Sequence, residues 1–179
     1  WNESGALDES FSDLIGVMVD RDDWLIGEDL NPTRPKRNFK DPATGSPAQP
    51  SSYQNYKKYP ISYDQGGVHY NSGIQNRAFY LIAVGLSLEG KGESIGREKT
   101  EIIAYKTMTT LASSDSKFID SANRMIAVAE GEYGIGSLEV AAVEKAWELV
   151  GVSVETTPVE TEPEPESEFQ LSVGDDFLV

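Results

Sequence analysis

Apolar residues recur at the spacing of an α-helix in five segments of this chain, and short connections separate the last four. Residues 6–20 place their apolar side chains on one broad face: Leu7, Phe11, Leu14, Ile15, Met18 and Val19. The segments 71–88, 97–112, 114–131 and 137–150 follow. No alternating pattern typical of a strand competes with them. The sequence therefore predicts a mainly α fold, a five-helix bundle-like domain.

Polar and glycine residues mark where these helices are expected to begin and end. A side-chain oxygen before a helix can accept a hydrogen bond from one of its first backbone N–H groups. Gly151 follows the last helix, and glycine commonly closes a helix in the left-handed conformation. The expected N-terminal caps are Asn71 or Ser72, Ser114 or Ser116, and Ser137.

Residues 21–64 differ in kind, because they are rich in Pro, Asn, Asp, Ser and Tyr and show little periodicity. Proline removes a backbone N–H and fixes φ, so its frequent use forbids long regular elements. The prolines are Pro32, Pro35, Pro42, Pro47, Pro50 and Pro60. We expect a long irregular loop, which is unusual in a compact domain and often functional.

The composition changes sharply after Val152. Residues 153–168 contain six glutamates among Thr, Pro and Ser and no basic residue. Such a segment buries too little apolar surface to offset its conformational entropy, so we expect an extended acidic linker. Residues 169–179 are apolar again and are either the start of a further module or a docked tail. The predicted organisation is a domain over residues 1–152, the linker, and this last segment.

Charge and composition exclude several classes of function. A formal charge of -15 argues against nucleic-acid binding, which needs a surplus of Lys and Arg on one face. The chain has no cysteine, so disulfides and thiol chemistry are excluded. No run approaches the roughly 18 apolar residues of a membrane span. His69 is the single histidine, so a metal or acid–base site of this chain depends mainly on carboxylates.

Glu9 and Asp13 lie one helical turn apart in the first segment, so both carboxylates project from one face. One interpretation is an ordinary solvated face. However, apolar residues flank both acids, and carboxylates near an apolar face need a cation or hydrogen bonds to offset desolvation. The alternative is a metal ligand followed by an acid that orients another ligand.

Acidic residues crowd around Trp24, just after the first predicted helix. Close carboxylates repel each other unless a cation neutralises them, and calcium takes six to eight oxygen ligands. An exposed acidic loop and a calcium site both fit the composition, although the spacing does not fit an EF-hand. The crowded residues are Asp20, Asp22, Asp23, Glu28 and Asp29.

Asp64 and His69 flank a Gly66-Gly67 pair immediately before the second predicted helix. The glycines allow positive φ and a close approach to a ligand. A lone histidine is often structural, but an acid across a glycine turn can hold its imidazole in one tautomer. Arg37, in the proline-rich loop, can offer a fork of donors to a carbonyl or carboxylate. We also expect Glu9 and His69 to converge on one wall of a cleft.

Two motifs resemble the C-terminal part of the thermolysin (M4, neutral protease) family of zinc metallopeptidases. Residues 2–13, Asn-Glu-Ser-Gly-Ala-Leu-Asp-Glu-Ser-Phe-Ser-Asp, resemble the segment that supplies the third zinc ligand. Residues 66–74, Gly-Gly-Val-His-Tyr-Asn-Ser-Gly-Ile, resemble the active-site histidine segment. Residues 95–99 and 138–152 resemble the later helices of the family. The resemblance covers residues 2 to about 152, with both motifs in the family's order.

This resemblance implies a role for each candidate residue. Glu9 would ligate zinc, and Asp13 would accept a hydrogen bond from a zinc-bound histidine. His69 would donate to the oxyanion of the tetrahedral intermediate, with Asp64 orienting it, and Arg37 would bind the substrate carbonyl on the primed side. One calcium ion is also implied, with these ligands: Asp20, Asp23, Glu28 and the backbone carbonyl of Leu25.

The family's His-Glu-x-x-His helix, which completes the zinc site, has no counterpart in this sequence. We therefore expect the C-terminal part of a secreted, extracellular zinc metalloendopeptidase that acts on peptides or proteins. The absent N-terminal half would be its partner in the catalytic unit, and this chain alone is expected to be inactive. Such a chain is expected to be a fragment or a processed product. The alternative is a non-catalytic helical module derived from such a protease and kept for structure or binding.

Overall fold

The computed structural model describes residues 1–111 and 115–154 and confirms a mainly helical fold. Within these residues no helix is long and apolar enough to cross a membrane. The expectations for Ser114 and for residues 155–179 lie outside the described part of the chain. The long helices are α1(Asn2–Val19), α2(Asp64–Tyr80), α4(Arg97–Thr110), α5(Phe118–Tyr133) and α6(Leu138–Leu149).

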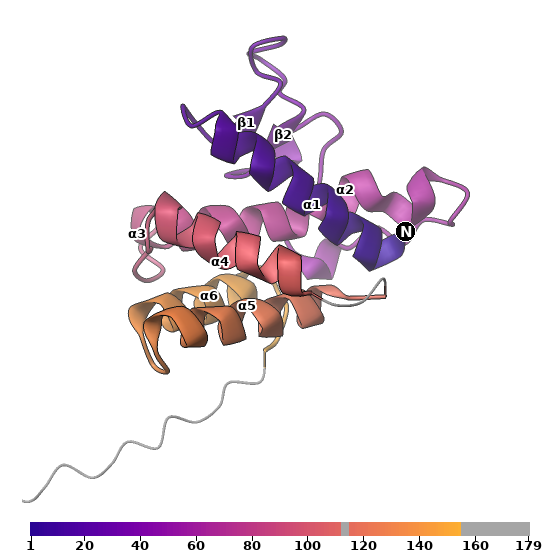
Figure 1. The fold of residues 1–179 in the computed structure, drawn as a ribbon. Helices are drawn as coiled ribbons and strands as arrows, with labels where there is room; N and C mark the ends of the chain where they lie inside the picture. Colours follow the sequence, from indigo (N-terminus) through magenta and orange to yellow (C-terminus); the bar gives the residue numbers. More distant parts are fainter. Residues whose placement is uncertain (112–114, 155–179) are drawn as a thin grey trace, which may run out of the picture.

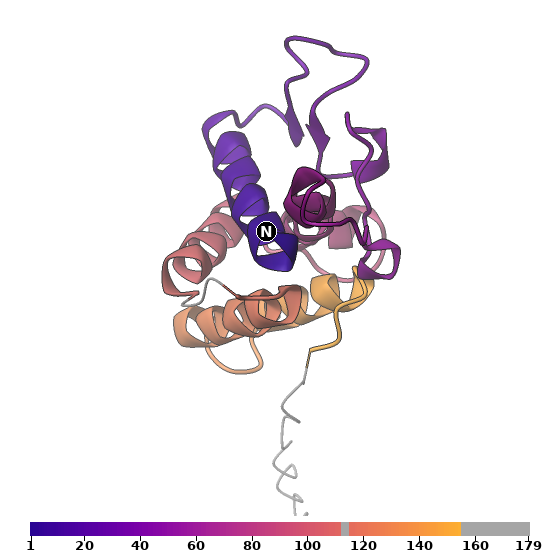
Figure 2. The same cartoon turned by 90° about the vertical axis from the view of Figure 1, so that its right-hand side faces the viewer.

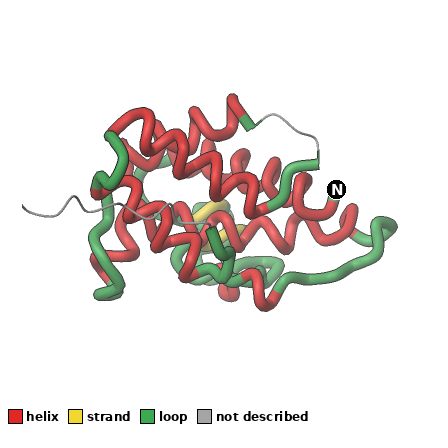
Figure 3. Tube along the Cα trace, turned by 90° about the horizontal axis from the view of Figure 1, so that it is seen from below, coloured by secondary structure: helices red, strands yellow, loops and turns green. Residues whose placement is uncertain are grey.

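The helices pack in layers around one core (Figure 1). α1 crosses α2, and α4 lies beside them, while α5 and α6 pack against each other below (Figure 3). Phe79 of α2, Phe118 of α5 and Trp147 of α6 are buried in this core. Burying a large apolar side chain stabilises a fold by roughly 1.5–3 kcal/mol. Figure 2 shows the first part of the segment between α1 and α2 on the side of the molecule away from α5 and α6. Its later part reaches the end of α6, where Tyr53 N donates to Val150 O at 2.7 Å.

α1 begins at Asn2, four residues earlier than the sequence predicts. Gly5 weakens the helical pattern there, yet the structure needs a glycine at this position. A Cβ on Gly5 would lie 2.6 Å from Val68 Cγ1. The missing side chain therefore lets α1 approach α2 closely, which brings the first turns of the two helices together.

α2 begins at Asp64, so the predicted caps at Asn71 and Ser72 are wrong. Both residues are buried inside the helix. The Asn71 side chain instead accepts from Lys57 N at 2.8 Å and donates to Lys57 O at 3.0 Å, so it binds the preceding loop. The helix continues through a π-helical segment, η3(Leu81–Gly85), and one turn, α3(Leu86–Leu88), and so stops where the sequence predicts.

The ends of the last two helices agree with the sequence in part. Ser137 caps α6 by accepting from Val140 N at 3.3 Å. Gly151 closes α6 with φ +82, and Val152 N donates to Trp147 O at 3.0 Å. Ser116 does not begin α5, which starts at Phe118. The N-terminus of α5 is instead fixed by Asp120, whose carboxylate accepts a hydrogen bond from Lys117 N at 2.8 Å.

The segment between α1 and α2 is mostly irregular, as predicted, but it contains a small sheet that the sequence analysis missed. β1(Leu25–Ile26) pairs antiparallel with β2(Arg37–Asn38), and Leu25 lies opposite Asn38. Strands of two residues are too short to show alternation in a sequence. Two short 3₁₀ turns follow, η1(Pro42–Thr44) and η2(Tyr53–Asn55). Phe39, fully buried, anchors the loop to the core.

Candidate active site

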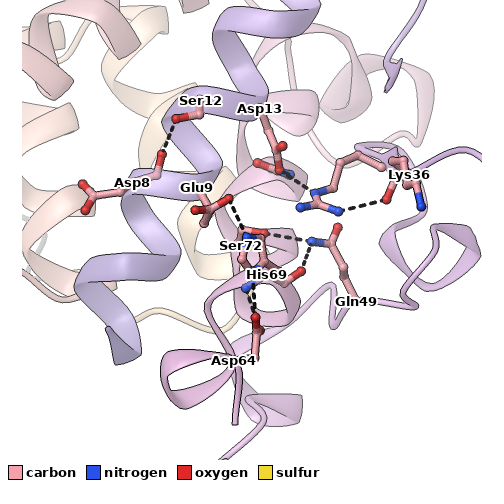
Figure 4. Close-up of polar contacts among 11 residues, drawn as sticks. Asp8, Glu9, Ser12, Asp13, Lys36, Gln49, Asp64, His69 and Ser72 are labelled. Atoms are coloured by element: carbon pink, nitrogen blue, oxygen red, sulfur yellow. Dashed lines mark hydrogen bonds and ion pairs between the residues drawn. The ribbon is translucent and has the colours of Figure 1, made fainter. Parts of the chain in front are cut away.

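The carboxylate of Glu9 and the imidazole of His69 meet where α1 crosses the start of α2 (Figure 4). Glu9 Oε2 lies 3.3 Å from His69 Nε2. The Glu9 side chain is 36% exposed and the His69 side chain 45% exposed, so both groups are open to a ligand. The expected convergence of residues 9 and 69 is therefore observed.

Asp64 holds the other edge of the His69 ring. Its Oδ1 lies 2.5 Å from His69 Nδ1, and its Oδ2 accepts from the His69 backbone N–H at 3.0 Å. A carboxylate only accepts hydrogen bonds, so Nδ1 carries a proton and donates it. This leaves Nε2 as the ring nitrogen that faces Glu9 and the solvent.

A left-handed turn places Asp64 and His69 on either side of Gly66 and Gly67. Asp64 and Gln65 have φ of 49 and 52, and the two glycines have φ of 90 and 87. A Cβ on Gly66 would collide with the Asn2 side chain, and one on Gly67 would lie 2.8 Å from the Tyr59 ring. The predicted positive φ of the glycine pair is confirmed. The close approach in the structure is to Asn2 and Tyr59, and the approach to a ligand stays a prediction.

Asp13 lies one turn after Glu9 on α1 and binds two donors through one oxygen. Arg37 Nε and Asn76 Nδ2 each donate to Asp13 Oδ2 at 2.8 Å. Among the described residues, no donor contacts Asp13 Oδ1. The structure thus brings Asp13 into the same cluster as Glu9, with one carboxylate oxygen still open to a further donor.

Arg37 is buried against α1, although it belongs to β2 in the loop. Its residue surface is 9% exposed, and its Nη1 donates to Lys36 O at 3.1 Å. Its Nε is used by Asp13, so the fork predicted from the sequence is only partly available. Nη2 forms no hydrogen bond with the described residues and remains an open donor.

Two buried amides of this cluster carry no signal in the sequence. Gln49 Nε2 donates to His69 O and to Ser72 Oγ, both at 2.8 Å, and so ties the loop to the first turn of α2. Asn76 joins Asp13 to Ser10. Both amides read as ordinary polar residues along the chain, because their partners lie far away in sequence.

Three tyrosines form an aromatic wall beside the histidine turn. The ring of Tyr59 lies 4.8 Å from that of Tyr63 and 5.2 Å from that of Tyr70, centroid to centroid. The Tyr63 and Tyr70 hydroxyls are 3.1 Å apart. The hydrogen bond with Tyr63 raises the pKa of Tyr70 to about 12, so the Tyr70 phenol is neutral at ordinary pH and can act as a hydrogen-bond donor.

The acidic residues after α1 form a second cluster. Carboxylate oxygens of Asp20, Glu28 and Asp29 lie within 4.8 Å of one another. Glu28 Oε2 is buried and has no hydrogen-bond partner in the described part of the chain. Asp23 is not part of this group, and its Oδ1 accepts from Leu25 N at 2.7 Å. Asp29 was named among the crowded acidic residues but not among the implied calcium ligands, which included Asp23 and Leu25.

The two clusters differ in their capacity to hold a metal. Within the described residues, the acidic cluster is the one set of three potential ligands that lies close enough to share an ion. The oxygens of this set, one of them buried and unpaired, suit a hard cation such as calcium. Glu9 offers a single carboxylate beside His69, so a metal bound there would need additional ligands from outside these residues.

The chain is similar in sequence to bacterial proteases. The chain is 42% identical over 155 residues to "Neutral protease B" of Bacillus subtilis (strain 168) and 43% identical over 156 residues to "Bacillolysin" of Brevibacillus brevis. Each match covers 84% of this chain but only 28% and 29% of those proteins. The chain therefore spans less than a third of the length of these relatives.

A solved structure shares the fold. The precursor of protealysin, a metalloproteinase from Serratia proteamaculans, matches with a TM-score of 0.68 and 32% identity, over 86% of this chain and 51% of that one. Residues 1–152 also match the sequence model of the family described as "Thermolysin metallopeptidase, alpha-helical domain". Because this match spans most of the chain, the protein belongs to the thermolysin family of metallopeptidases, of which residues 1–152 represent the α-helical domain.

Proposed function

We propose that this chain is the C-terminal part of a secreted, zinc-dependent metalloendopeptidase that hydrolyses peptide bonds in peptides or proteins. The observation that carries the proposal is the contact of His69 Nε2 with Glu9 Oε2 at 3.3 Å, with Asp64 fixing the ring from the other side. Secretion is supported by the bacterial neutral proteases among its relatives. The chain has no cysteine, so it has no thiol that could be oxidised outside the cell.

The residues of this chain fit part of a catalytic zinc site. Glu9 is an accessible carboxylate, and Asp13 Oδ1 is an open acceptor one turn away, suited to the N–H of a ligating histidine. The two remaining protein ligands and the glutamate that activates water would come from a His-Glu-x-x-His helix in the N-terminal half. When bound, zinc supplies polarisation of the scissile carbonyl and of a water molecule.

The residues of this chain would then bind and stabilise the reacting peptide. The His69 ring donates Nδ1–H to Asp64, and a proton on its Nε2 would be donated to the oxyanion that develops on the attacked carbonyl. Asp64 keeps this ring in place through both of its oxygens. Arg37 Nη2, on a guanidinium held by Asp13, donates to the substrate carbonyl on the primed side.

The acidic cluster is proposed to bind one calcium ion. Asp20 and Glu28 were expected ligands, and Asp29 joins them in the structure. Asp23, whose Oδ1 accepts from Leu25 N, would join by moving toward these three carboxylates, and the Leu25 carbonyl completes the expected set. A calcium ion would also satisfy the buried Glu28 Oε2, which lacks a donor in the described part of the chain.

The direct test replaces Glu9 in the complete protein, with Asp8 as the matched control. Asp8 precedes Glu9 on α1 and points away from His69 (Figure 4). Zinc content by mass spectrometry and hydrolysis of a peptide substrate are measured for Glu9→Ala and Asp8→Ala. We expect the first variant to lose both zinc and activity and the second to keep both. Retention of zinc and activity in Glu9→Ala would contradict the proposal.

The isolated chain gives a second test of the same idea. Because Glu9 is the one zinc ligand proposed for this chain, the isolated chain should bind zinc weakly and cleave no peptide. Isothermal titration with zinc and a peptide-cleavage assay measure these properties. Tight zinc binding with peptide cleavage by the chain alone would show that the N-terminal half is not needed, and would overturn the proposed division of the site.

A further inference from the structure

Hydrogen bonds between buried polar side chains run from the interface of α1 and α2 to the site. Ser10 of α1 and Asn76 of α2 are 0% and 1% exposed. Ser10 Oγ donates to Asn76 Oδ1 at 2.6 Å, and Asn76 Nδ2 donates to Asp13 Oδ2 at 2.8 Å. Buried polar groups are stable only when they are hydrogen-bonded. Ser10, Asn76 and Asp13 satisfy one another across the two helices.

The chemistry of these groups fixes the orientation of the amide. An ionised carboxylate only accepts, so the NH₂ group of Asn76 must face Asp13. Its carbonyl oxygen then faces Ser10, whose hydroxyl can donate. The reverse orientation would place the carbonyl of Asn76 against the carboxylate of Asp13. Ser10 therefore keeps the donor of Asn76 directed at Asp13.

We infer that Asn76 is a positioning residue for the Asp13 carboxylate. Together with Arg37 Nε, it binds Oδ2 and thereby fixes the plane of the carboxylate. Oδ1 is then left as the open acceptor, and Arg37 is held with its Nη2 toward the substrate side. This inference rests on the proposed function, in which Oδ1 receives the N–H of a zinc-bound histidine.

The neighbouring residue of α2 provides a matched control. Gln75 is also a fully buried amide, and its Oε1 accepts from Ser121 Oγ of α5 at 2.6 Å. The pair of Gln75 and Ser121 thus repeats the serine–amide contact of Ser10 and Asn76, but it has no hydrogen bond to Asp13. Loss of either amide should weaken helix packing, whereas only loss of Asn76 should release the carboxylate.

The experiment compares Asn76→Leu with Gln75→Leu in the complete metallopeptidase. Zinc affinity is measured by competition with a chelator, the melting temperature by circular dichroism, and kcat and KM with a peptide substrate. Loss of a group that orients a metal ligand typically lowers metal affinity or activity by about 10- to 100-fold. We expect a fall of about tenfold in zinc affinity and in kcat for Asn76→Leu alone. Both variants should have lower melting temperatures.

A milder pair keeps the test decisive if Asn76→Leu does not fold. Ser10→Ala removes the hydroxyl that orients the Asn76 amide, and Ser121→Ala removes the corresponding hydroxyl of the control pair. Ser10→Ala should lower zinc affinity measurably, and Ser121→Ala should not. Equal zinc affinities in both pairs of variants would overturn the inference.

A separate variant distinguishes this failure from a failure of the proposed function. Asp13→Ala removes the carboxylate itself and should lower zinc affinity at least as much as Asn76→Leu. If Asp13→Ala weakens zinc binding while Asn76→Leu behaves like Gln75→Leu, the inference about Asn76 is wrong and the function stands. If Asp13→Ala leaves zinc binding unchanged, the role of Asp13 in the proposed function is wrong, and the inference fails with it.

Discussion

His69 Nε2 lies 3.3 Å from Glu9 Oε2, which joins the N-terminal part of α2 to the middle of α1. The same ring contacts Asp64 through Nδ1 at 2.5 Å. The imidazole is therefore held between carboxylates from two elements. Its position depends on how closely α1 and α2 cross, so changes at the ring, at the turn and in the surrounding packing should have separable effects.

Replacement of His69 should lower the turnover of the complete enzyme. Loss of one oxyanion donor typically lowers kcat by about 100- to 1,000-fold. We expect His69→Ala to show a fall of this size with a much smaller change in KM, measured by steady-state peptide hydrolysis. Tyr70→Phe is the control, because the Tyr70 hydroxyl is hydrogen-bonded with Tyr63 and forms no hydrogen bond with a carboxylate of the described residues. An unchanged kcat in His69→Ala would remove this residue from the mechanism.

Gly66→Ala should destabilise the fold and displace the Asp64–His69 pair. Gly66 has φ +90, and an added Cβ would collide with the Asn2 side chain of α1. Strained backbone of this kind costs about 1–3 kcal/mol. Gly131→Ala in α5 is the control, since nothing lies within 4 Å of its added Cβ. In a helix this change should stabilise by roughly 0.5–1 kcal/mol. Urea unfolding of both variants measures the difference, and similar free energies of unfolding would refute the expectation.

Calcium should stabilise the protein through the acidic cluster. A ligand that binds only the folded state at 100 times its Kd adds about 2.7 kcal/mol to stability. We expect a chelator to lower the melting temperature of the native protein. Glu28→Gln should remove most of this response, because it neutralises the buried carboxylate of the cluster. Asp22→Asn, outside the cluster of three carboxylates, should retain it. An unchanged melting temperature in the presence of the chelator would exclude the calcium site.

Alkaline pH should loosen the contact between α1 and the loop near Tyr53. The Tyr53 hydroxyl donates to Glu3 Oε1 at 2.9 Å. Burial and this hydrogen bond to the Glu3 carboxylate raise the pKa of Tyr53 from 10.0 to about 12. Because the folded state binds the phenol proton more tightly, the contact is fully stabilising below pH 10. Its stabilisation is lost as the pH rises toward 12.

Tyr53→Phe isolates this effect. At neutral pH the change should lower the free energy of unfolding by less than about 1 kcal/mol, since the pair is partly exposed to solvent. Between pH 9 and 12, the melting temperature of the native protein should fall more than that of Tyr53→Phe. Parallel curves for the two proteins would show that Tyr53 does not contribute to the alkaline transition.

Short-range patterns in the sequence were enough to predict the helices and part of the site. The helical spacing of apolar residues indicated all five long helices, and Ser137 and Gly151 indicated the ends of α6, because these signals act within a few residues. The glycine pair between Asp64 and His69 indicated a turn with positive φ for the same local reason. The order of the two motifs then indicated the family to which the chain belongs.

Only the tertiary structure decided how the polar side chains pair. Asn71 was expected to cap a helix but binds Lys57, and Asn76 connects Asp13 with Ser10. The first helix was predicted to begin at residue 6, yet α1 begins at Asn2 and includes Gly5, which lies against Val68 of α2. These outcomes depend on contacts between residues far apart in the chain, where burial makes each unpaired polar group costly. Local sequence determines which elements form, and packing determines which donor meets which acceptor.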